Sequence, residues 1–336
     1  MNKKTAIYLS CSLGIFAIVF CVALMVGRYP MALSDFFKCI FSSDSAYNTQ
    51  RSIILNLRLP RTLMACFAGI GLSVSGLLYQ EIFQNKLTSP DLLGVSSGAS
   101  VGAAIAILLG LSSVFISVFA FVMGVATVMI TMIVARLFKN NNSSVTLILA
   151  GIIVGGFMSA MLSLVKYFAD PTTTLASITY WLMGSFQNAK MTEVYIMFPV
   201  MLASCIALLL MSWRINIIAL GREEAQTKGL NYKAYRISII AIATLLTALS
   251  VAFCGTISWI GLVVPHIVRL IVGRDTRKTI PLCMTFGATF MILVDIFSRT
   301  FTDAEIPLSA ITGLFGTIIF VIILVYRRKE VYNDNN

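Results

Sequence analysis

Three arginines and one aspartate lie at the ends of long apolar runs, where charged side chains are unusual. Arg58 and Arg61 come immediately before the apolar run 62–80, and Arg299 follows Asp295 by four residues at the end of another run. Cations at the start of a helix oppose its dipole. These arginines either anchor a helix at a membrane surface by snorkelling or offer a docking site to an acidic surface. Arg299 can pair with Asp295 across one helical turn, or it can face outward.

The residues that most catalytic and metal sites need are scarce in this sequence. It has one histidine, His266, and its seven cysteines form no Cys-x-x-Cys pair, so we expect no catalytic residue, no metal site and no disulfide framework. We interpret His266 as a structural residue at a helix break. The chain has no Gly-x-x-x-x-Gly-Lys-Ser/Thr phosphate loop, so any energy from ATP must come from a partner.

Composition identifies the class of protein. Of the 336 residues, 58% are hydrophobic and only 12% are charged, whereas about 25% of an ordinary soluble domain is charged. So few polar residues cannot cover a soluble core. This excludes a soluble enzyme and a disordered protein, and predicts an all-α polytopic membrane protein. The net charge of +11 then indicates basic cytoplasmic loops rather than binding to nucleic acid.

Stretches without Asp, Glu, Lys or Arg mark the membrane-spanning helices, whose ends position the three arginines and Asp295. The run 92–135 has 44 residues, or about 66 Å as one helix, so it must form two spans that turn near Gly110. The run 237–268 is ambiguous by length. Two crossings, broken near Gly255, place 17 Lys and Arg inside and 8 outside, whereas one crossing places 11 inside and 14 outside. The positive-inside rule therefore predicts ten transmembrane helices with both termini cytoplasmic. The predicted spans of this single domain, 1–336, are 6–27, 62–80, 92–109, 114–135, 144–165, 194–213, 237–254, 257–272, 279–299 and 306–326.

Three segments of the chain are neither internal membrane-spanning helices nor simple loops. The first apolar run, 6–27, is longer than a signal-peptide core and no small-residue cleavage site follows it, so we predict a retained helix. Residues 32–41 could lie flat at the outer surface. Residues 175–186 are apolar but too short to span, so we expect a helix that lies at the external face.

Small residues recur every four positions in the third and fifth predicted spans. In lipid, such a stripe lets two helix backbones approach closely, so we expect tight helix packing rather than a pore. The glycines concerned are Gly94, Gly98, Gly102, Gly151 and Gly155.

The longest predicted cytoplasmic loop is 214–236. Two of its glycines are spaced to begin and end a short helix with an acidic start and a small centre. Such a helix suits docking into the cleft of a partner, although a solvated loop explains the same composition. The residues are Gly221, Glu223, Glu224, Ala225 and Gly229.

A series of motifs runs from Arg58 to Lys329. The motifs in the first half of the chain are Arg58-Leu59-Pro60-Arg61, Val74-Ser75-Gly76, Asn85-Lys86-Leu87 with Pro90, Leu93-Gly94-Val95-Ser96-Ser97-Gly98-Ala99 and Leu149-Ala150-Gly151. Those in the second half are Trp181-Leu182-Met183-Gly184-Ser185, Leu220-Gly221 with Gly229, Gly255 with Trp259-Ile260-Gly261-Leu262-Val263-Val264-Pro265-His266-Ile267-Val268-Arg269, Asp295 with Arg299, and Glu305-Ile306-Pro307. In this order and spacing they resemble the permease subunits of ABC importers for iron–siderophore complexes, haem and cobalamin, which are FecCD-like, type II importers.

The resemblance implies a set of partners in a bacterial cell membrane. These are a second permease chain, identical or different, two cytoplasmic ATP-binding subunits and an extracytoplasmic substrate-binding protein. The ATPase would hold ATP and Mg²⁺, so this chain would carry no cofactor. The loop 214–236 would receive the ATPase. Arg58, Arg61 and Arg299 would pair with acidic residues of the binding protein. The residues matching the family's cytoplasmic gate are Asn85, Leu87, Ser143 and Ser144.

Several positions depart from the family pattern. Lys86 stands where a proline is usual, Lys228 where a leucine is usual and Ser309 where a glycine is usual, and Gly316-Thr317-Ile318 replaces Gly-Ala-Pro. The last change predicts a more flexible final helix.

The function that we expect is ATP-driven import of a ferric siderophore or related metal chelate by alternating access. Haem, cobalamin or an oxyanion are alternative cargoes. An ion-coupled secondary transporter would need acidic residues near mid-membrane, for which Asp295 is the candidate. A membrane enzyme would need clustered His, Asp or Glu.

Overall fold

The computed structural model describes residues 3–29, 31, 36, 38, 47–138 and 144–333, and within these ranges the chain is built from helices and turns without a β-strand. Ser143 and most of the predicted surface helix 32–41 lie outside the described residues. The helices are α1 (Lys3–Met25), α3 (Asn48–Ser52), η2 (Ile53–Arg58), α4 (Leu59–Ile82), η3 (Pro90–Leu93), α5 (Val95–Leu108), α6 (Ser113–Leu137), α7 (Ser144–Phe168), α8 (Thr174–Met183), α9 (Met191–Ile218), α10 (Arg222–Thr227), α11 (Tyr232–Cys254), α12 (Ile260–Val272), α13 (Thr276–Thr300) and α14 (Leu308–Asn333).

The described chain has seven helices that are long and apolar enough to cross a membrane. They are α1, the continuous helix from α3 to α4, α6, α7, α9, α11 and α13. The apolar helices α5 and α12 and the apolar part of α14 are shorter. These elements follow the order of the predicted spans, and the protein is an all-helical polytopic membrane protein. The number of ten crossings stays a prediction.

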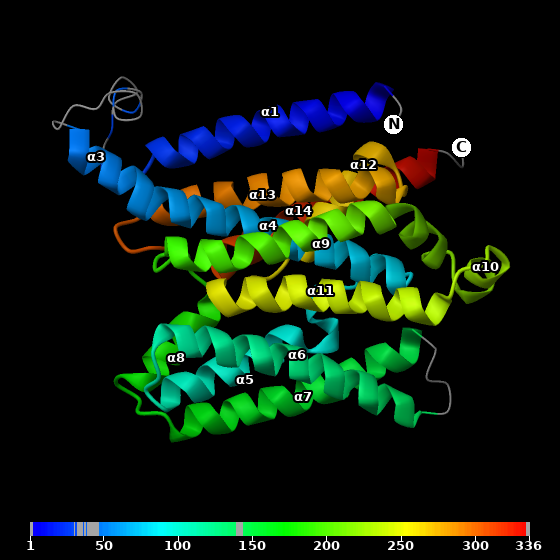
Figure 1. Cartoon of the computed structure of the whole chain (residues 1–336), viewed down its shortest axis with the longest axis horizontal. Coiled ribbons are helices and arrows are strands. Elements are labelled where there is room, and N and C mark those ends of the chain that lie inside the picture. Colours follow the sequence, from blue (N-terminus) through cyan, green and yellow to red (C-terminus); the bar gives the residue numbers. More distant parts are fainter. Residues whose placement is uncertain are drawn as a thin grey trace.

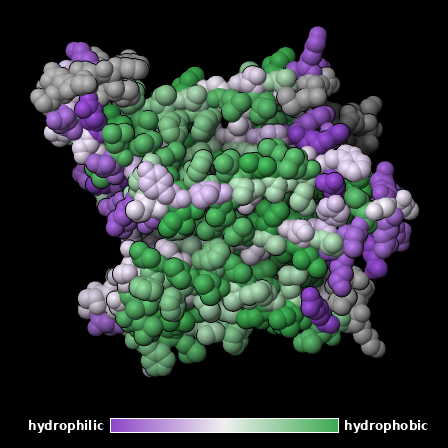
Figure 2. Space-filling view, in the orientation of Figure 1, coloured by the Kyte–Doolittle hydropathy of each residue, from purple (hydrophilic) through white to green (hydrophobic). Residues whose placement is uncertain are grey.

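The long helices lie side by side along the long axis of the molecule (Figure 1). The start of α1, the end of α14 and the short helix α10 lie at one end, which we call the α10 end. The helix α8 and the segment α3 lie at the other, the α8 end. Hydrophobic side chains cover the middle of the visible face and hydrophilic ones gather at both ends (Figure 2). This banding is the pattern that a bilayer requires of a helical bundle.

Both ambiguous apolar runs fold as pairs of helices. The run 92–135 forms α5 and α6, which are joined by a turn where Gly110 has φ +66°. The run 237–268 forms α11 and α12, and the break contains Gly255 and Trp259, each with φ +72°. A left-handed backbone costs glycine little, which is why the chain can turn at Gly110 and Gly255.

The helix α4 occupies the centre of the bundle, and almost all of its residues are buried. Glycines let its backbone touch its neighbours. A Cβ added at Gly69 would overlap the carbonyl of Gly287 in α13, and one added at Gly76 would overlap the carbonyl of Gly261 in α12. Close backbone packing of this kind stabilises helix pairs inside a membrane, where the hydrophobic effect cannot drive association.

The predicted glycine stripes pack differently in the two helices. In α5, a Cβ at Gly98 would overlap the Thr127 hydroxyl of α6, and Gly94 and Gly102 also face α6. In α7, Gly151 packs against the backbone of η3. By contrast, a Cβ at Gly155 would meet no described atom within 4 Å. The Gly155 backbone nevertheless lies 3.7 Å from a Cβ placed at Gly94, so α7 approaches the start of α5 at this glycine.

Arg58 and Arg61 do not lie at the start of a helix. The segments α3, η2 and α4 form one continuous helix from Asn48 to Ile82, and η2 is a π-helical stretch inside it. The conflict between cations and a helix start, which we inferred from the sequence, does not arise. Residues 48–58 mix polar side chains with apolar ones such as Ile53 and Leu57, so the uncharged run that marks the rest of α4 does not extend over them.

Candidate functional site

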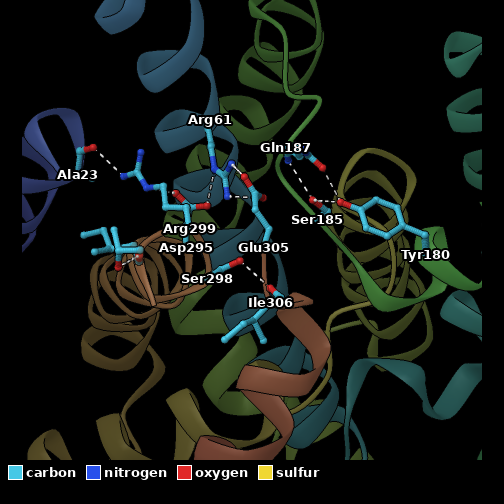
Figure 3. A network of polar contacts seen from close by, with 12 residues as sticks. Ala23, Arg61, Tyr180, Ser185, Gln187, Asp295, Ser298, Arg299, Glu305 and Ile306 are labelled. Atoms are coloured by element: carbon cyan, nitrogen blue, oxygen red, sulfur yellow. Dashed lines mark hydrogen bonds and ion pairs between the residues drawn. The ribbon is translucent and has the colours of Figure 1, made fainter. Parts of the chain in front are cut away.

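A cluster of charged residues lies at the α8 end, where α4 meets α13 and the loop before α14 (Figure 3). Arg61 is its centre. Its Nε donates to Asp295 Oδ1 at 2.7 Å, and its Nη1 and Nη2 donate to the two carboxylate oxygens of Glu305 at 2.7 and 3.0 Å. We call Arg58, Arg61, Asp295, Arg299 and Glu305 the arginine cluster.

Arg299 completes the pairing of the buried aspartate. Its Nε lies 3.4 Å from Asp295 Oδ2, one turn along α13, and its Nη2 donates to the carbonyl of Ala23 at 2.7 Å. Of the two orientations that the sequence left open, the structure has the pair with Asp295. The loop that carries Glu305 is held to α13 by Ser298, whose hydroxyl donates to the carbonyl of Ile306 at 2.6 Å.

Arg58 binds the end of α1. Its guanidinium donates to the carbonyls of Leu24, Met25 and Tyr29 at 3.0, 2.5 and 2.6 Å. The last carbonyls of a helix lack intrahelical partners and carry its negative dipole end, so a cation is stabilising there. Arg58 and Arg299 thus fix α1 against α4 and α13.

The arginines of the cluster are buried. Arg58, Arg61 and Arg299 are 5, 9 and 5% exposed, and Asp295 is 0% exposed. The structure therefore brings all three predicted docking residues together, but directs their donors at acceptors of the same chain. An open cavity of about 240 Å³ reaches them and is also lined by Arg28 and Glu305. Whether a partner binds there stays a prediction.

The predicted short helix of the loop 214–236 is α10. It begins after Gly221, which has φ +111°, and ends before Gly229, which has φ +73°. Leu230 N donates to Ala225 O at 2.9 Å and Gly229 N donates to Gln226 O at 3.0 Å. These two bonds form a Schellman motif, which closes the helix at its carboxyl end.

The side chains of α10 divide into an anchor and an exposed face. Ala225 is fully buried, whereas Glu223 and Glu224 are exposed in the first turn, where the helix dipole favours carboxylates. Nothing lies within 4 Å of a Cβ placed at Gly229. The helix is therefore fixed on one side and open on the other.

Hydrogen bonds join the end of α9, just before α10, to the segment after α4 and to the start of α13. Gln84, just after α4, donates from Nε2 to Ala219 O at 3.0 Å. Asn216 donates from Nδ2 to Asp275 Oδ1 at 2.7 Å and accepts from Thr276 N at 2.7 Å. The segment that leads into α10 is therefore bonded to the end of one central helix, α4, and to the start of another, α13.

Asp275 is the acceptor at the start of α13. Partial burial would raise the pKa of its carboxyl, but hydrogen bonds from Arg277 and Asn216 outweigh that effect and hold the pKa below its ordinary value. The residue is therefore a carboxylate at neutral pH, able to accept from both neighbours.

A second buried ion pair links α4 to α12. Arg269 Nη2 lies 3.0 Å from Glu81 Oε1, and Arg269 also donates to the side chain of Gln80. Gln80 Nε2 in turn donates to Gly261 O at 3.0 Å. Sequence reasoning missed this group, although Glu81 and Arg269 each follow directly after an apolar run.

The predicted gate residues that the structure describes lie in and beside one turn. Leu87 N donates to Asn85 Oδ1 at 2.9 Å, and the Leu87 side chain is 61% exposed. The Ser144 hydroxyl, at the start of α7, is 3.5 Å from Ile82 O. The turn after α4 is thus adjacent to the start of α7, while Ser143 lies outside the described residues.

His266 is buried in α12 against Phe320, with their ring centroids 5.6 Å apart. The described residues contain no group of three or more His, Cys, Asp or Glu that could hold a metal ion.

Comparison with known proteins agrees with this architecture. Residues 15–326 match the FecCD transport family. This chain belongs to the FecCD transport family. The family consists of ABC transporter permease subunits, as the motifs indicated, and the protein is therefore a permease of the membrane.

Relatives of this FecCD permease align over nearly their whole length. It is 36% identical to a molybdate import system permease protein of Haemophilus influenzae, covering 92% of each chain. It is 32% identical to an iron chelatin transport system permease protein of Helicobacter pylori strain 26695, covering 98% of this chain and 99% of the other. A solved structure of a metal-chelate type ABC transporter in an inward-facing conformation superposes with a TM-score of 0.86 at 34% identity, covering 95% of this chain and 99% of that one.

Proposed function

We propose that this FecCD permease is the membrane-spanning subunit of an ATP-driven importer in a bacterial plasma membrane. The observation that carries the proposal is the construction of the α10 loop. The helix is closed at its carboxyl end and exposes an acidic first turn, and the end of α9 just before it is hydrogen-bonded to Gln84 and Asp275. A short surface helix joined in this way to central helices suits the transfer of a partner's movement into the bundle.

In this proposal the α10 end faces the cytoplasm and the chain crosses the membrane ten times. The beginning of α1, with Lys3 and Lys4, and the basic residues 274–278 lie in segments at that end. Basic residues concentrate on the cytoplasmic side of membrane proteins. Both termini would then be cytoplasmic.

Three kinds of partner would complete the transporter. Two ATP-binding subunits would dock on α10 and hold ATP and Mg²⁺, so that this chain needs no cofactor. A second permease chain, identical or different, would cover α7, where Gly155 has open space beside it and Ile152 and Phe157 are exposed. An extracytoplasmic binding protein would deliver the cargo at the α8 end.

The arginine cluster is the proposed receptor for the binding protein. An acidic side chain that entered the cavity beside Arg28 would compete with Glu305 for Arg61. Because the cluster carries three positive and two negative side chains, one further carboxylate would balance its charge.

The proposed cargo is a ferric siderophore or a related metal chelate, carried by alternating access. One relative is named for iron chelatin and another for molybdate, so haem, cobalamin and an oxyanion remain as alternatives. The secondary-transporter alternative is disfavoured because Asp295, the carboxylate it would use, is paired with Arg61 and Arg299.

Replacing Gly229 with tryptophan tests the proposal. The new side chain has space in the folded chain but would block an ATPase on α10, so we expect the ATPase to be lost on copurification and ATP-driven uptake to fail. Gly110→Trp is the matched control, since Gly110 also has positive φ and open space but lies in the α5–α6 turn. Undiminished ATPase binding by Gly229→Trp, or uptake that needs an ion gradient and no ATP, would refute the proposal.

A further inference from the structure

A small cavity at the α10 end is lined by three basic side chains. It has a volume of about 90 Å³ and lies where α6, α7 and α11 meet. Arg136 comes from the end of α6, and Lys233 and Arg236 come from the first turns of α11. None of the docking, coupling or gate residues named above lines this cavity.

The described lining of this cavity is basic. Its described lining contains no Asp or Glu, and neither Arg136 nor Lys233 forms an ion pair with a described residue. Arg236 is 6% exposed, with its Cζ 5.9 Å from the centre of the Tyr232 ring. Cations in the first turns of a helix also oppose its dipole. A bound anion would relieve the repulsion among the cations and the conflict with the helix dipole together.

The remaining lining is apolar. Met132, Leu147 and Ile240 form part of the wall, and the exposed Ile133 and Ile237 continue the apolar surface of α6 and α11. A free inorganic anion would gain nothing from such surroundings. A molecule with an anionic head and hydrocarbon chains matches both the basic residues and the apolar residues.

We propose that this cavity binds the phosphate group of an anionic phospholipid in the leaflet at the α10 end. Arg136, Lys233 and Arg236 contact the phosphate, and the acyl chains lie along α6 and α11. The proposal rests on the membrane orientation of the proposed function, but not on its cargo or its partners. Since Lys233 and Arg236 belong to the segment that follows α10 directly, the lipid would hold the end of the loop that receives the ATPase.

Native mass spectrometry of the full purified chain tests this. The delipidated chain is incubated with phosphatidylglycerol or with phosphatidylcholine of the same acyl chains. The double variant Arg136→Gln/Lys233→Gln removes two exposed charges and leaves the buried Arg236 in place, so folding is preserved. Arg214→Gln/Lys228→Gln is the matched control, because it removes two exposed charges from the same end but outside the cavity lining.

We expect the wild-type chain to retain phosphatidylglycerol in preference to phosphatidylcholine. The cavity variant should bind it about thirty-fold more weakly, and the control variant should differ from wild type by less than about twofold. Equal retention of the two lipids, or an equal loss in both variants, would overturn the proposal. Release of the lipid by millimolar inorganic phosphate would assign the cavity to a free anion and also overturn it. The measurement does not use uptake, so a failure of the import proposal would not affect it.

Discussion

Replacing Arg61 with methionine should destabilise the folded protein by about 3–5 kcal/mol, because it breaks a buried ion pair on one side only. Methionine is also a long unbranched side chain, but it removes the donors that hold Asp295 at 2.7 Å and Glu305 at 2.7 and 3.0 Å. Asp295 is fully buried, and its remaining cation, Arg299, lies 3.4 Å away. The substitution therefore leaves a buried carboxylate with too little positive charge around it.

Two further variants make this result specific. Arg277→Met breaks an Arg–Asp pair of similar length, 3.1 Å, whose arginine side chain is 59% exposed, so it should have only a small effect. Adding Asp295→Asn to Arg61→Met neutralises the stranded carboxylate and should recover part of the lost stability.

The free energy of unfolding can be measured by reversible denaturation of the purified chain in mixed micelles, followed by tryptophan fluorescence. The reasoning is refuted if Arg61→Met costs no more than Arg277→Met, or if Asp295→Asn in the Arg61→Met background lowers stability further. Either result would mean that the burial of these side chains does not determine how much their ion pairs contribute to the free energy of unfolding.

The packing of α4 and the hydrogen bonds at the α10 end can be tested in the same way. Gly76→Ala should lower the free energy of unfolding by about 1–3 kcal/mol in the same assay, because its Cβ would overlap the backbone of Gly261. Gly14→Ala is the control, since Gly14 has open space and its substitution should leave the stability unchanged. Equal effects of the two substitutions would contradict the close α4–α12 contact. Asp275→Asn should lower the thermal midpoint most above about pH 5. The difference from wild type should shrink as the pH falls through and below about 4. The reason is that a carboxyl whose pKa is lowered in the folded state stabilises the protein only while it is ionised. A difference that grew on acidification would reverse the sign of that argument.

Much of the fold could be predicted from where charges are absent. A 44-residue apolar run is too long for one helix, and the structure turns it at Gly110. The extension of α4 back to Asn48 could not be predicted in this way, because residues 48–58 include Asn56, Arg58 and other polar groups. Their helix is stabilised by contacts with α1, which composition does not record.

The sequence singled out Arg58, Arg61, Asp295 and Arg299 of the candidate site, but it gave no role to Glu305 and did not reveal the bonding. The sequence placed Asp295 and Arg299 one turn apart, and that pair exists. It could not show that Glu305 binds Arg61 across 244 positions, or that Arg58 binds the carbonyls at the end of α1. Such partners are set by the packing of distant helices, so a pattern of local spacing contains no record of them. This is why surface docking residues were expected where the structure has a buried network.

The two central helices explain how events at opposite ends could be joined. The helices α4 and α13 touch through Gly69 and Gly287, so neither can slide without the other. At the α8 end Arg61 binds Asp295, and at the α10 end Gln84 and Asp275 are bonded to Ala219 and Asn216 at the end of α9. A displacement of the end of α9 that moved this pair of helices would therefore also reach the arginine cluster. Because Glu305 lies in a loop while Asp295 is fixed within α13, the contact between Arg61 and Glu305 is the one that such a movement would change first.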